Sequence, residues 1–505
     1  SRAECAAVPA RCPCTAPPAP VPTEERAMAR RWLGVVPGLL LLGLGAWSAA
    51  AARESTTSGA VFATDFLPGD YLGGQEATRV TLEGWAQETY SGFFRFNASG
   101  RAVEGLTVNT FFWFLPSEDG NPDAPVVLWL QGGPGASSLF GMFTEIGPFT
   151  INADMEVVPL NPEYSWNRNY SLLFLDNPVG AGYSFTDDRR AMVTNEKQVG
   201  SDLHAALLQF FQLFPDLRAN DFFVTGESYA GKYVPACAFT IDQMNQQATV
   251  EEEKINLKGM SIGDGAMDPA QQFRGFGHLL FNIGMVNLHE KRQFEAYDAK
   301  MEEALAGGDF LAAFDVFDEM LNGDFYPYGT YYTNVTGLTN YFNYEQGDAG
   351  NGIPDYFTEW LALPEVKDAI HVGDLPYHSF NGSVEEHLKA DWMRGVLDMV
   401  VPILENPDYR VLIYSGQNDV ILGAALTEQM LDSLQWQGLR DFREARKSVW
   451  RIPEAADPVA GYITNVPTWK FTYAVVRGAG HMVPTDQPER ASDLITTFIS
   501  GGFLS

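Results

Sequence analysis

One short turn constrains the fold of this chain more than any other feature. Phe222–Val224 is an apolar run that predicts a buried strand, and the segment from Lys232 to about Met244 has helical periodicity. Between them lies Thr225-Gly226-Glu227-Ser228-Tyr229-Ala230-Gly231, a Gly-x-Ser-x-Gly pattern altered at Ala230. A strand, tight turn and helix in this order can hold a serine in a strained conformation with its Oγ exposed. An ordinary strand-to-helix turn gives the same pattern, so the turn alone leaves both interpretations open.

The serine needs a base, and His481 is the best placed of the seven histidines. It follows the apolar run Phe471–Val476 and a Gly478-Ala479-Gly480 turn, which predicts a loop beyond the end of a strand. Asp419 follows another predicted strand, Tyr409–Tyr414, and could orient that histidine or simply cap a helix. The order Ser228, Asp419, His481, each after its own strand, is that of the α/β-hydrolase fold. It predicts a catalytic triad of these three residues.

A second glycine-rich turn could supply an oxyanion hole. Trp129-Leu130-Gln131-Gly132-Gly133-Pro134-Gly135 follows the apolar run Pro125–Gln131, which is predicted as a central strand. Glycines let backbone N–H groups come close to a substrate. We expect the N–H groups of Gly133 and Tyr229 to form the oxyanion hole, although a plain Gly-Pro turn would look the same.

The order of predicted elements indicates an α/β fold with a mostly parallel sheet. Strands are also expected at Thr110–Leu115, Leu172–Leu175 and Lys258–Ile262, and helices at Asn195–Phe214 and Pro488–Ile499. The alternation breaks between about residues 285 and 400, where charged, helix-compatible sequence predicts a helical cap insertion over the carboxyl edge of the sheet. Tyr326–Tyr344, rich in Tyr, Asn and Gly, predicts loops or a short hairpin.

The amino-terminal region is predicted to lie outside the folded domain. Residues 28–52 have a basic start, an apolar centre and a small-residue end, which are typical of a signal peptide. Residues 1–27, rich in Cys, Pro and Ala, are interpreted as upstream-translated leader sequence. The folded domain is then expected to span 53–505. No other apolar run approaches transmembrane length, so no membrane span is expected in the mature chain.

Charge and side-chain usage exclude several functions. The chain has 33 basic and 64 acidic residues, and a formal charge of −31 would repel a nucleic acid. Only Cys237 lies outside the leader, so no intramolecular disulfide is expected in the mature chain. No His-Glu-x-x-His pattern occurs, and neither a metal nor a cofactor is expected. Four N-glycosylation sequons support passage through the secretory pathway: Asn97, Asn169, Asn334 and Asn381.

Together these motifs resemble those of the serine carboxypeptidases. The resemblance runs from about Tyr90 to Phe498 and is carried by Trp129–Gly135, Asp176–Phe185, Gly226–Pro235, Gly416–Asp419 and Gly480–Pro484. The family's Gly-Glu-Ser-Tyr-Ala-Gly form accounts for Ala230. Gln131 and the Gly-Gln-Asn-Asp sequence at 416–419 are most similar to the vitellogenic carboxypeptidase-like branch.

The resemblance implies an exopeptidase that removes the last residue of peptides or proteins with a free C-terminus, through an acyl-enzyme. In the family a hydrogen-bonded acid network binds the terminal carboxylate, and it corresponds here to Trp129, Gln131, Glu145 and Glu227. Two carboxyls in one site cannot both ionise easily, so one can stay protonated and donate to that carboxylate. Gln131 stands where many relatives have Asn, which adds one methylene to the network.

The shared proton of Glu145 and Glu227, set against the need for a neutral His481, predicts a mildly acidic optimum. The signal peptide and sequons predict a secreted protein or one in a lysosomal or endosomal lumen. Two other functions stay open at this point. A related acyl transferase would use the same acyl-enzyme but an alcohol as acceptor. A non-catalytic binding protein could keep the fold, although every triad position is filled.

Overall fold

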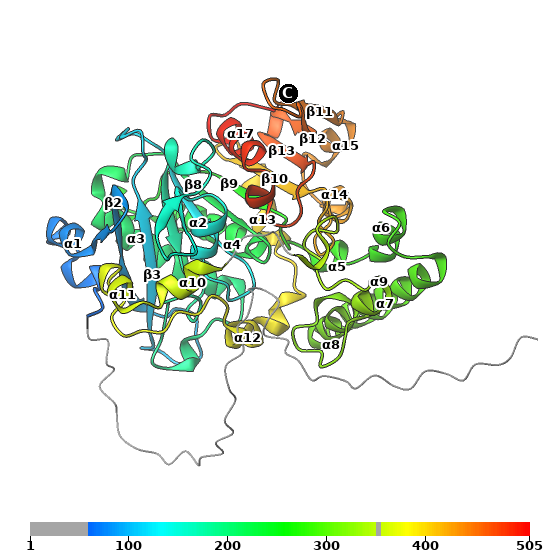
Figure 1. The fold of residues 1–505 in the computed structure, drawn as a ribbon, viewed down its shortest axis with the longest axis horizontal. Coiled ribbons are helices and arrows are strands. Elements are labelled where there is room, and N and C mark those ends of the chain that lie inside the picture. Colours follow the sequence, from blue (N-terminus) through cyan, green and yellow to red (C-terminus); the bar gives the residue numbers. More distant parts are fainter. Residues whose placement is uncertain (1–58, 350–354, 505) are drawn as a thin grey trace, which may run out of the picture.

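The computed structural model of the protein describes residues 59–349 and 355–504, and an 11-stranded sheet runs through it (Figure 1). Its spatial order is β1-β2-β3-β7-β4-β8-β9-β10-β13-β12-β11. The six central strands are parallel, as predicted. They are β7 (Ser171–Leu175), β4 (Val126–Leu130), β8 (Phe222–Glu227), β9 (Leu257–Gly263), β10 (Arg410–Gly416) and β13 (Phe471–Val476). Because parallel strands end at the same edge, the loops after β4, β8, β9, β10 and β13 can meet there.

Antiparallel strands flank this centre on both sides, and the sequence did not predict most of them. On one side lie β1 (Arg79–Leu82), β2 (Trp85–Asn97) and β3 (Thr107–Leu115); on the other lie β12 (Val459–Val466) and β11 (Ser448–Arg451). Only part of β3 was predicted, and it runs antiparallel to both of its neighbours. A 9-residue connection is enough to return β2 into β3, whereas a parallel pair needs a crossover.

Both faces of the central sheet are buried, which explains the apolar runs in its strands. Successive side chains of a strand point to opposite faces. Thus Val126, Leu128 and Leu130 of β4 join one core with helices α3 (Glu196–Leu213) and α4 (Ala230–Gln247). Val127 and Trp129 join the other core with α2 (Leu139–Thr144) and α17 (Pro488–Ile499).

The chain between β9 and β10 is a long helical insertion, but it is not one compact cap. Its helices are α5 (Pro269–Gln272), α6 (Phe276–Asn282), α7 (Leu288–Ala306), α8 (Phe310–Phe317), α9 (Tyr331–Thr336), α10 (Tyr356–Leu361), α11 (Pro364–Ala369), α12 (Gly382–Trp392) and α13 (Leu397–Glu405). Figure 1 shows α6–α9 standing at one side of the sheet, whereas α10 and α11 lie on the opposite side, near β3. Burial of Phe357 and Trp360 among the sheet's aromatic residues holds α10 there.

Within this insertion, Tyr326–Tyr344 forms α9 and turns rather than a hairpin, because Thr330 caps a short helix by accepting from the Thr333 N–H. The remaining elements are short: α1 (Tyr71–Thr78), β5 (Phe149–Ile151), β6 (Val157–Pro159), α14 (Ala424–Ser433), α15 (Leu439–Glu444) and α16 (Val483–Asp486). The predicted leader and signal peptide lie outside the described residues, so the domain boundaries stay predictions.

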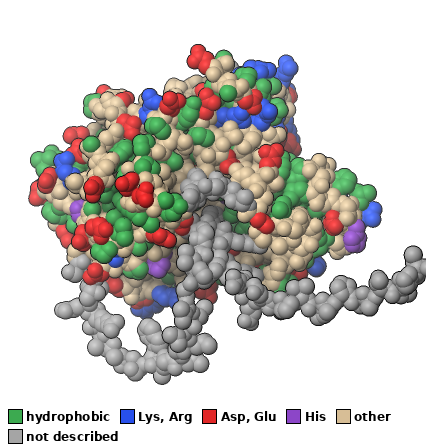
Figure 2. Space-filling model, in the orientation of Figure 1, with side chains coloured by type: hydrophobic (Ala, Val, Ile, Leu, Met, Phe, Trp, Pro, Cys, Tyr) green, Lys and Arg blue, Asp and Glu red, His purple; other side chains and the backbone are tan. Residues whose placement is uncertain are grey.

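Acidic side chains are spread over the visible face of the molecule, in keeping with the formal charge of −31 (Figure 2). Over the ranges 59–349 and 355–504, no helix combines the length and the apolar composition that a membrane crossing requires.

Candidate active site

Ser228 lies in the predicted strained turn between β8 and α4. Its φ of +63° falls in the left-handed region, which is uncommon for a residue other than glycine. Three backbone hydrogen bonds hold the turn: the Ser228 N–H donates to the Gly263 carbonyl at 3.1 Å, and the Ser228 carbonyl accepts from Gly231 at 2.9 Å and from Ala266 at 3.0 Å. The surrounding sheet therefore fixes this conformation, as expected where strain accompanies function.

The glycines beside Ser228 are required by close backbone contacts. A Cβ at Gly226 would collide with the Leu130 carbonyl oxygen of the neighbouring strand. A Cβ at Gly231 would lie 2.5 Å from the backbone nitrogen of Ala266. Ala230 is fully buried and fits without a collision of this kind. The second position that requires glycine is therefore Gly231, one residue later than in the usual Gly-x-Ser-x-Gly motif. This explains why alanine is tolerated at position 230.

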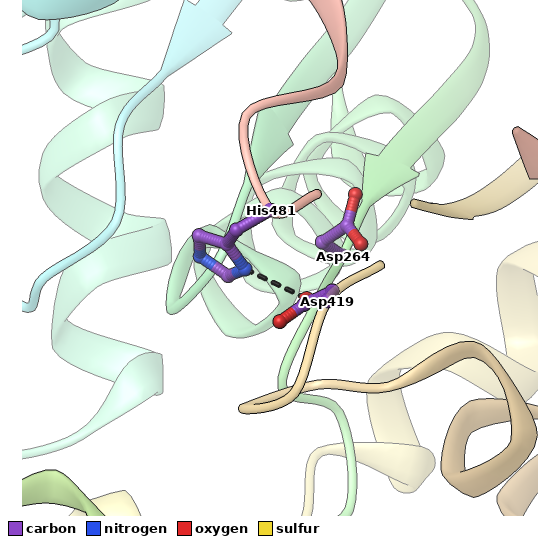
Figure 3. A group of neighbouring side chains, drawn as sticks. All are labelled: Asp264, Asp419 and His481. Atoms are coloured by element: carbon purple, nitrogen blue, oxygen red, sulfur yellow. Dashed lines mark hydrogen bonds and ion pairs between the residues drawn. The ribbon is translucent and has the colours of Figure 1, made fainter. Parts of the chain in front are cut away.

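His481 and Asp419 are joined by a buried hydrogen bond (Figure 3). The loop after β13 carries His481 and the loop after β10 carries Asp419; His481 Nδ1 lies 2.8 Å from Asp419 Oδ2. Burial lowers the pKa of His481, but the charge of Asp419 and its hydrogen bond outweigh burial, and the net pKa is raised. His481 Nε2 is buried and makes no hydrogen bond, which leaves it available as a base.

The helical insertion contributes to the position of His481. The Phe342 carbonyl accepts a 2.7 Å hydrogen bond from the His481 N–H, and the Phe342 ring lies 5.2 Å from the imidazole, centroid to centroid. A Cβ at Gly480 would collide with the same carbonyl. The segment at 341–345 also pairs with the loop of Asp419, because Tyr344 N donates to the Asn418 carbonyl at 3.1 Å.

The glycine-rich loop after β4 lies directly against the turn of Ser228. A Cβ at Gly132 would be 2.5 Å from Tyr229 N and 2.6 Å from Ser228 Cβ, so only glycine fits. Gly133 has a φ of +109°, which is open to glycine alone. This contact brings the predicted oxyanion loop and Tyr229 together.

Asp176 anchors the segment that follows the glycine-rich loop after β4, and no role was predicted for it. Its buried carboxylate accepts from Ser137 Oγ at 2.6 Å, from Ser138 N at 3.0 Å and from Tyr183 N at 2.9 Å. Burial raises the pKa of Asp176 to about 6, and these three donors only partly offset the shift. Asp176 directly follows β7 and begins the family motif Asp176–Phe185, and this position could have indicated a structural role.

The four residues predicted to bind a carboxylate lie together. Trp129 Nε1 donates to Gln131 Oε1 at 2.9 Å, and Gln131 Nε2 donates to Glu227 Oε1 at 2.8 Å. Burial raises the pKa of Glu145 to about 8, and the Glu227 and Gln131 side chains lower it only in part. Burial and the charge of Glu145 raise the pKa of Glu227. Because Gln131 donates to Glu227, its longer side chain is compatible with the network.

Asp264 is a second buried carboxyl at this edge that the sequence did not reveal. Asp264 follows β9 as Asp419 follows β10. This equivalent position beyond a neighbouring strand could have indicated that Asp264 lies near the site. One oxygen from Asp264, one from Asp419 and one ring nitrogen of His481 all lie within 4.8 Å of one another. In the described ranges no other set of three metal-ligating side chains is this close. A metal there would compete with the His481–Asp419 hydrogen bond, so the geometry favours a hydrogen-bonded cluster.

The sequons differ in exposure. Asn97, Asn169 and Asn334 are exposed, whereas Asn381 is half-buried and caps α12. Asn381 Nδ2, the atom that would carry a glycan, donates to the Gly180 carbonyl at 2.8 Å. Asn334 Nδ2 makes a similar bond, to the Gly329 carbonyl at 2.9 Å, so exposure alone makes the three exposed asparagines the better glycosylation candidates.

The sheet, the strained serine turn and the three loops at its edge define a protein of the α/β-hydrolase class. A prohormone-processing carboxypeptidase from Saccharomyces cerevisiae has the same fold, with a TM-score of 0.71 at 22% identity, over 84% of this chain and 96% of that one. The family model for serine carboxypeptidases matches residues 81–501. The chain therefore belongs to the serine carboxypeptidase family.

Known relatives agree with this assignment over most of the chain. A venom serine carboxypeptidase of Apis mellifera is 43% identical over 413 residues, 82% of this chain and 84% of that protein. The probable serine carboxypeptidase CPVL of Homo sapiens is 41% identical over 446 residues, covering 87% and 90%. The vitellogenic carboxypeptidase of Aedes aegypti is 37% identical over 419 residues, covering 83% and 84%. The resemblance deduced from the motifs is confirmed, and the protein is a serine-type carboxypeptidase.

Proposed function

We propose that this protein removes C-terminal amino acids from peptides and proteins through a covalent acyl-enzyme on Ser228. The observation that carries the proposal is the strained, buried turn of Ser228 with the hydrogen-bonded pair of His481 and Asp419 at the same sheet edge. Ser228 Oγ attacks the carbonyl carbon of the last peptide bond while His481 Nε2 takes its proton. Asp419 holds the imidazole and stabilises its positive charge.

The N–H groups of Gly133 and Tyr229 stabilise the tetrahedral oxyanion. Collapse of this intermediate breaks the C–N bond, and His481 returns the proton to the departing amino acid. Water, activated by His481, then attacks the acyl-enzyme and releases the shortened peptide. The close contact between Gly132 and Tyr229 supports the pairing of these two donors.

The network of Trp129, Gln131, Glu145 and Glu227 recognises the terminal carboxylate of the substrate. The buried carboxyl pair retains a proton, so it can donate a hydrogen bond to the substrate carboxylate instead of repelling it. Once both glutamates ionise, three anions share one buried site and binding weakens. This recognition selects the free C-terminus and makes the enzyme an exopeptidase.

Two titrations set the pH range of the reaction. The carboxyl pair must keep its last proton, which burial and the charge of Glu145 hold on Glu227, so peptide binding weakens as pH rises through the raised pKa of Glu227. His481 must be neutral, so kcat falls as pH drops below its raised pKa. We propose that kcat/KM is greatest between these two limits. The predicted signal peptide and sequons support a secreted enzyme or one in a lysosomal or endosomal lumen.

The test compares the purified wild-type protein with Ser228→Ala on a peptide library, with products identified by mass spectrometry. Wild type should release single C-terminal residues and should leave amidated peptides largely intact. Ser228→Ala should lose on the order of 10⁴-fold in kcat. An organophosphonate should label wild type at Ser228 and leave the variant unlabelled. Peptidase activity that survives in a folded Ser228→Ala protein would refute the assignment.

A further inference from the structure

Asp264 lies close to Asp419 and His481 of the candidate triad, and its carboxyl group takes no part in the mechanism given above. Asp264 follows β9, is fully buried and has a φ of +41°, so its backbone is held in the left-handed region. Figure 3 shows Asp264 close to Asp419 and His481. The ends of β9 and β10 thus place two carboxyl groups near each other. The backbone of Asp264 is held in a conformation that a residue other than glycine rarely adopts.

The two oxygens of Asp264 have different surroundings. Oδ1 accepts a 2.7 Å hydrogen bond from the Gly416 N–H, at the end of the strand that leads to Asp419. Oδ2 is buried without a conventional hydrogen-bond donor. An oxygen of Asp264 also lies within 4.8 Å of an oxygen of Asp419. Two anions at this distance in a buried site repel strongly, whereas one proton between them makes a hydrogen bond.

Asp419 already accepts two hydrogen bonds, from His481 at 2.8 Å and from the Leu422 N–H at 3.3 Å. In a hydrogen bond between the two carboxyl groups, Asp419 is therefore the acceptor and Asp264 the donor. Among the described residues, no Lys, Arg or His side chain forms a hydrogen bond or ion pair with Asp264. The ionisable groups around Asp264 are Asp419, His481 and Glu227, with the Tyr414 and Tyr473 hydroxyls. Burial together with the charge of Asp419 raises the pKa of Asp264 well above the usual range.

We propose that Asp264 is a positioning residue that carries a proton and donates it as a hydrogen bond to Asp419. The donated bond fixes the Asp419 carboxylate on His481 Nδ1, and the Gly416 contact fixes the loop that bears Asp419. The inference rests on the proposed acyl-enzyme mechanism and extends it from a triad to a row of four groups: Ser228, His481, Asp419 and Asp264.

The experiment compares Asp264→Asn and Asp264→Ala with wild type in the secreted, full-length product. The substrate is a blocked ester without a free carboxylate, so that Glu145 and Glu227 do not influence the pH profile. Rates are expressed per active site titrated with an organophosphonate, which removes unfolded protein from the comparison. Asp318→Asn is the matched control, because Asp318 is a buried carboxyl in the insertion that likewise accepts backbone N–H groups.

An amide donates as a carboxylic acid does and is neutral like one. Asp264→Asn should therefore keep kcat within about threefold of wild type and leave the acid limb of the profile, which reports His481, at the same pH. Asp264→Ala removes a hydrogen bond to a charged group and should lose roughly 10- to 100-fold in kcat. The Asp318 control should match wild type in both respects.

Two results would overturn the proposal. If Asp264 were an anion in wild type, Asp264→Asn would remove a negative charge near His481, and the acid limb would move to lower pH. If Asp264 only filled space, Asp264→Ala would be as active as Asp264→Asn. Both results are compatible with an inactive Ser228→Ala protein, so failure of this inference is distinguishable from failure of the proposed function.

Discussion

At the scale of single residues, buried carboxyl groups are the most informative feature of this protein. Glu145, Glu227, Asp176 and Asp264 are all buried, and burial raises the pKa of each. Glu227, Asp176 and Asp264 each accept hydrogen bonds from N–H groups or hydroxyls of the loops that form the candidate site. The arrangement indicates that protonation of carboxyl groups, as well as of the histidine, controls activity.

The carboxyl pair yields a prediction about substrate affinity. In wild type, KM for a peptide with a free C-terminus should rise by about tenfold per pH unit above the raised pKa of Glu227, because the pair loses its last proton there. The doubly substituted Glu145→Gln, Glu227→Gln protein should show a flatter rise, since amides donate at every pH. The measurement is KM against pH for a peptide and for its C-terminally amidated form.

The amidated peptide is the control, because it lacks the carboxylate that the pair would repel, and its KM should change little between pH 7 and 9. Superimposable KM–pH profiles for the two substrates would exclude the shared-proton model, even with the triad intact.

At the scale of elements, helix α4 is tied to α12 of the insertion by a buried ion pair. Lys232 Nζ lies 2.9 Å from Asp391 Oδ2, and the Lys232 side chain is completely buried. The ammonium group also lies 5.0 Å from the centroid of the Tyr229 ring, at the start of α4. Because Tyr229 belongs to the predicted oxyanion hole, this pair links the insertion to the site.

We expect Lys232→Met to reduce the free energy of unfolding by about 3–5 kcal/mol, because Asp391 would lose its partner while staying buried. Chemical denaturation measures the change. Arg440→Ala is the control: Arg440 pairs with Glu444 on the surface of α15, and such exposed pairs contribute little. Equal stabilities of the two variants would show that the Lys232–Asp391 pair does not hold the insertion in place.

At the scale of the whole molecule, the buried carboxyl groups should make stability depend on pH. Burial raises the pKa of Glu145 and of Glu196 to about 8 in the folded protein, against about 4.3 in an unfolded chain. Between these values the folded state binds more protons than the unfolded state, so the free energy of unfolding falls as pH rises. Above pH 8 the contribution is lost.

We therefore expect Tm to be higher at pH 6.5 than at pH 8.5, by on the order of 5 °C. His204, His371 and His378 act in the opposite direction, because burial lowers their pKa values and the unfolded chain binds more protons near pH 6.5. Each of them is only about half protonated at pH 6.5 in the unfolded chain, so this opposing effect is small. Differential scanning calorimetry of wild type, with Glu196→Gln as the comparison, tests this. Glu196→Gln should flatten the dependence; a Tm that rises from pH 6.5 to 8.5 would contradict the explanation.

The sequence by itself determined the central layer of this protein and the residues at its edge. Fully buried parallel strands must be nearly continuous apolar runs, and β13 and α17 were predicted with the bounds that the structure shows. Turns that bring backbones into contact require glycine, so Gly226, Gly132 and Gly480 marked the loops around Ser228 and His481. These are local constraints, and a single chain displays them.

Only the tertiary structure decided which groups meet across the chain. The antiparallel strands β1, β2, β11 and β12 and the two separate parts of the insertion depend on long-range packing that leaves little local pattern. The roles of Asp176 and Asp264 depend on neighbours far away in sequence: Asp176 accepts from Ser137, and Asp264 accepts from Gly416. A carboxyl group becomes a buried acid only when the fold removes its water, and no local pattern in the sequence records that removal.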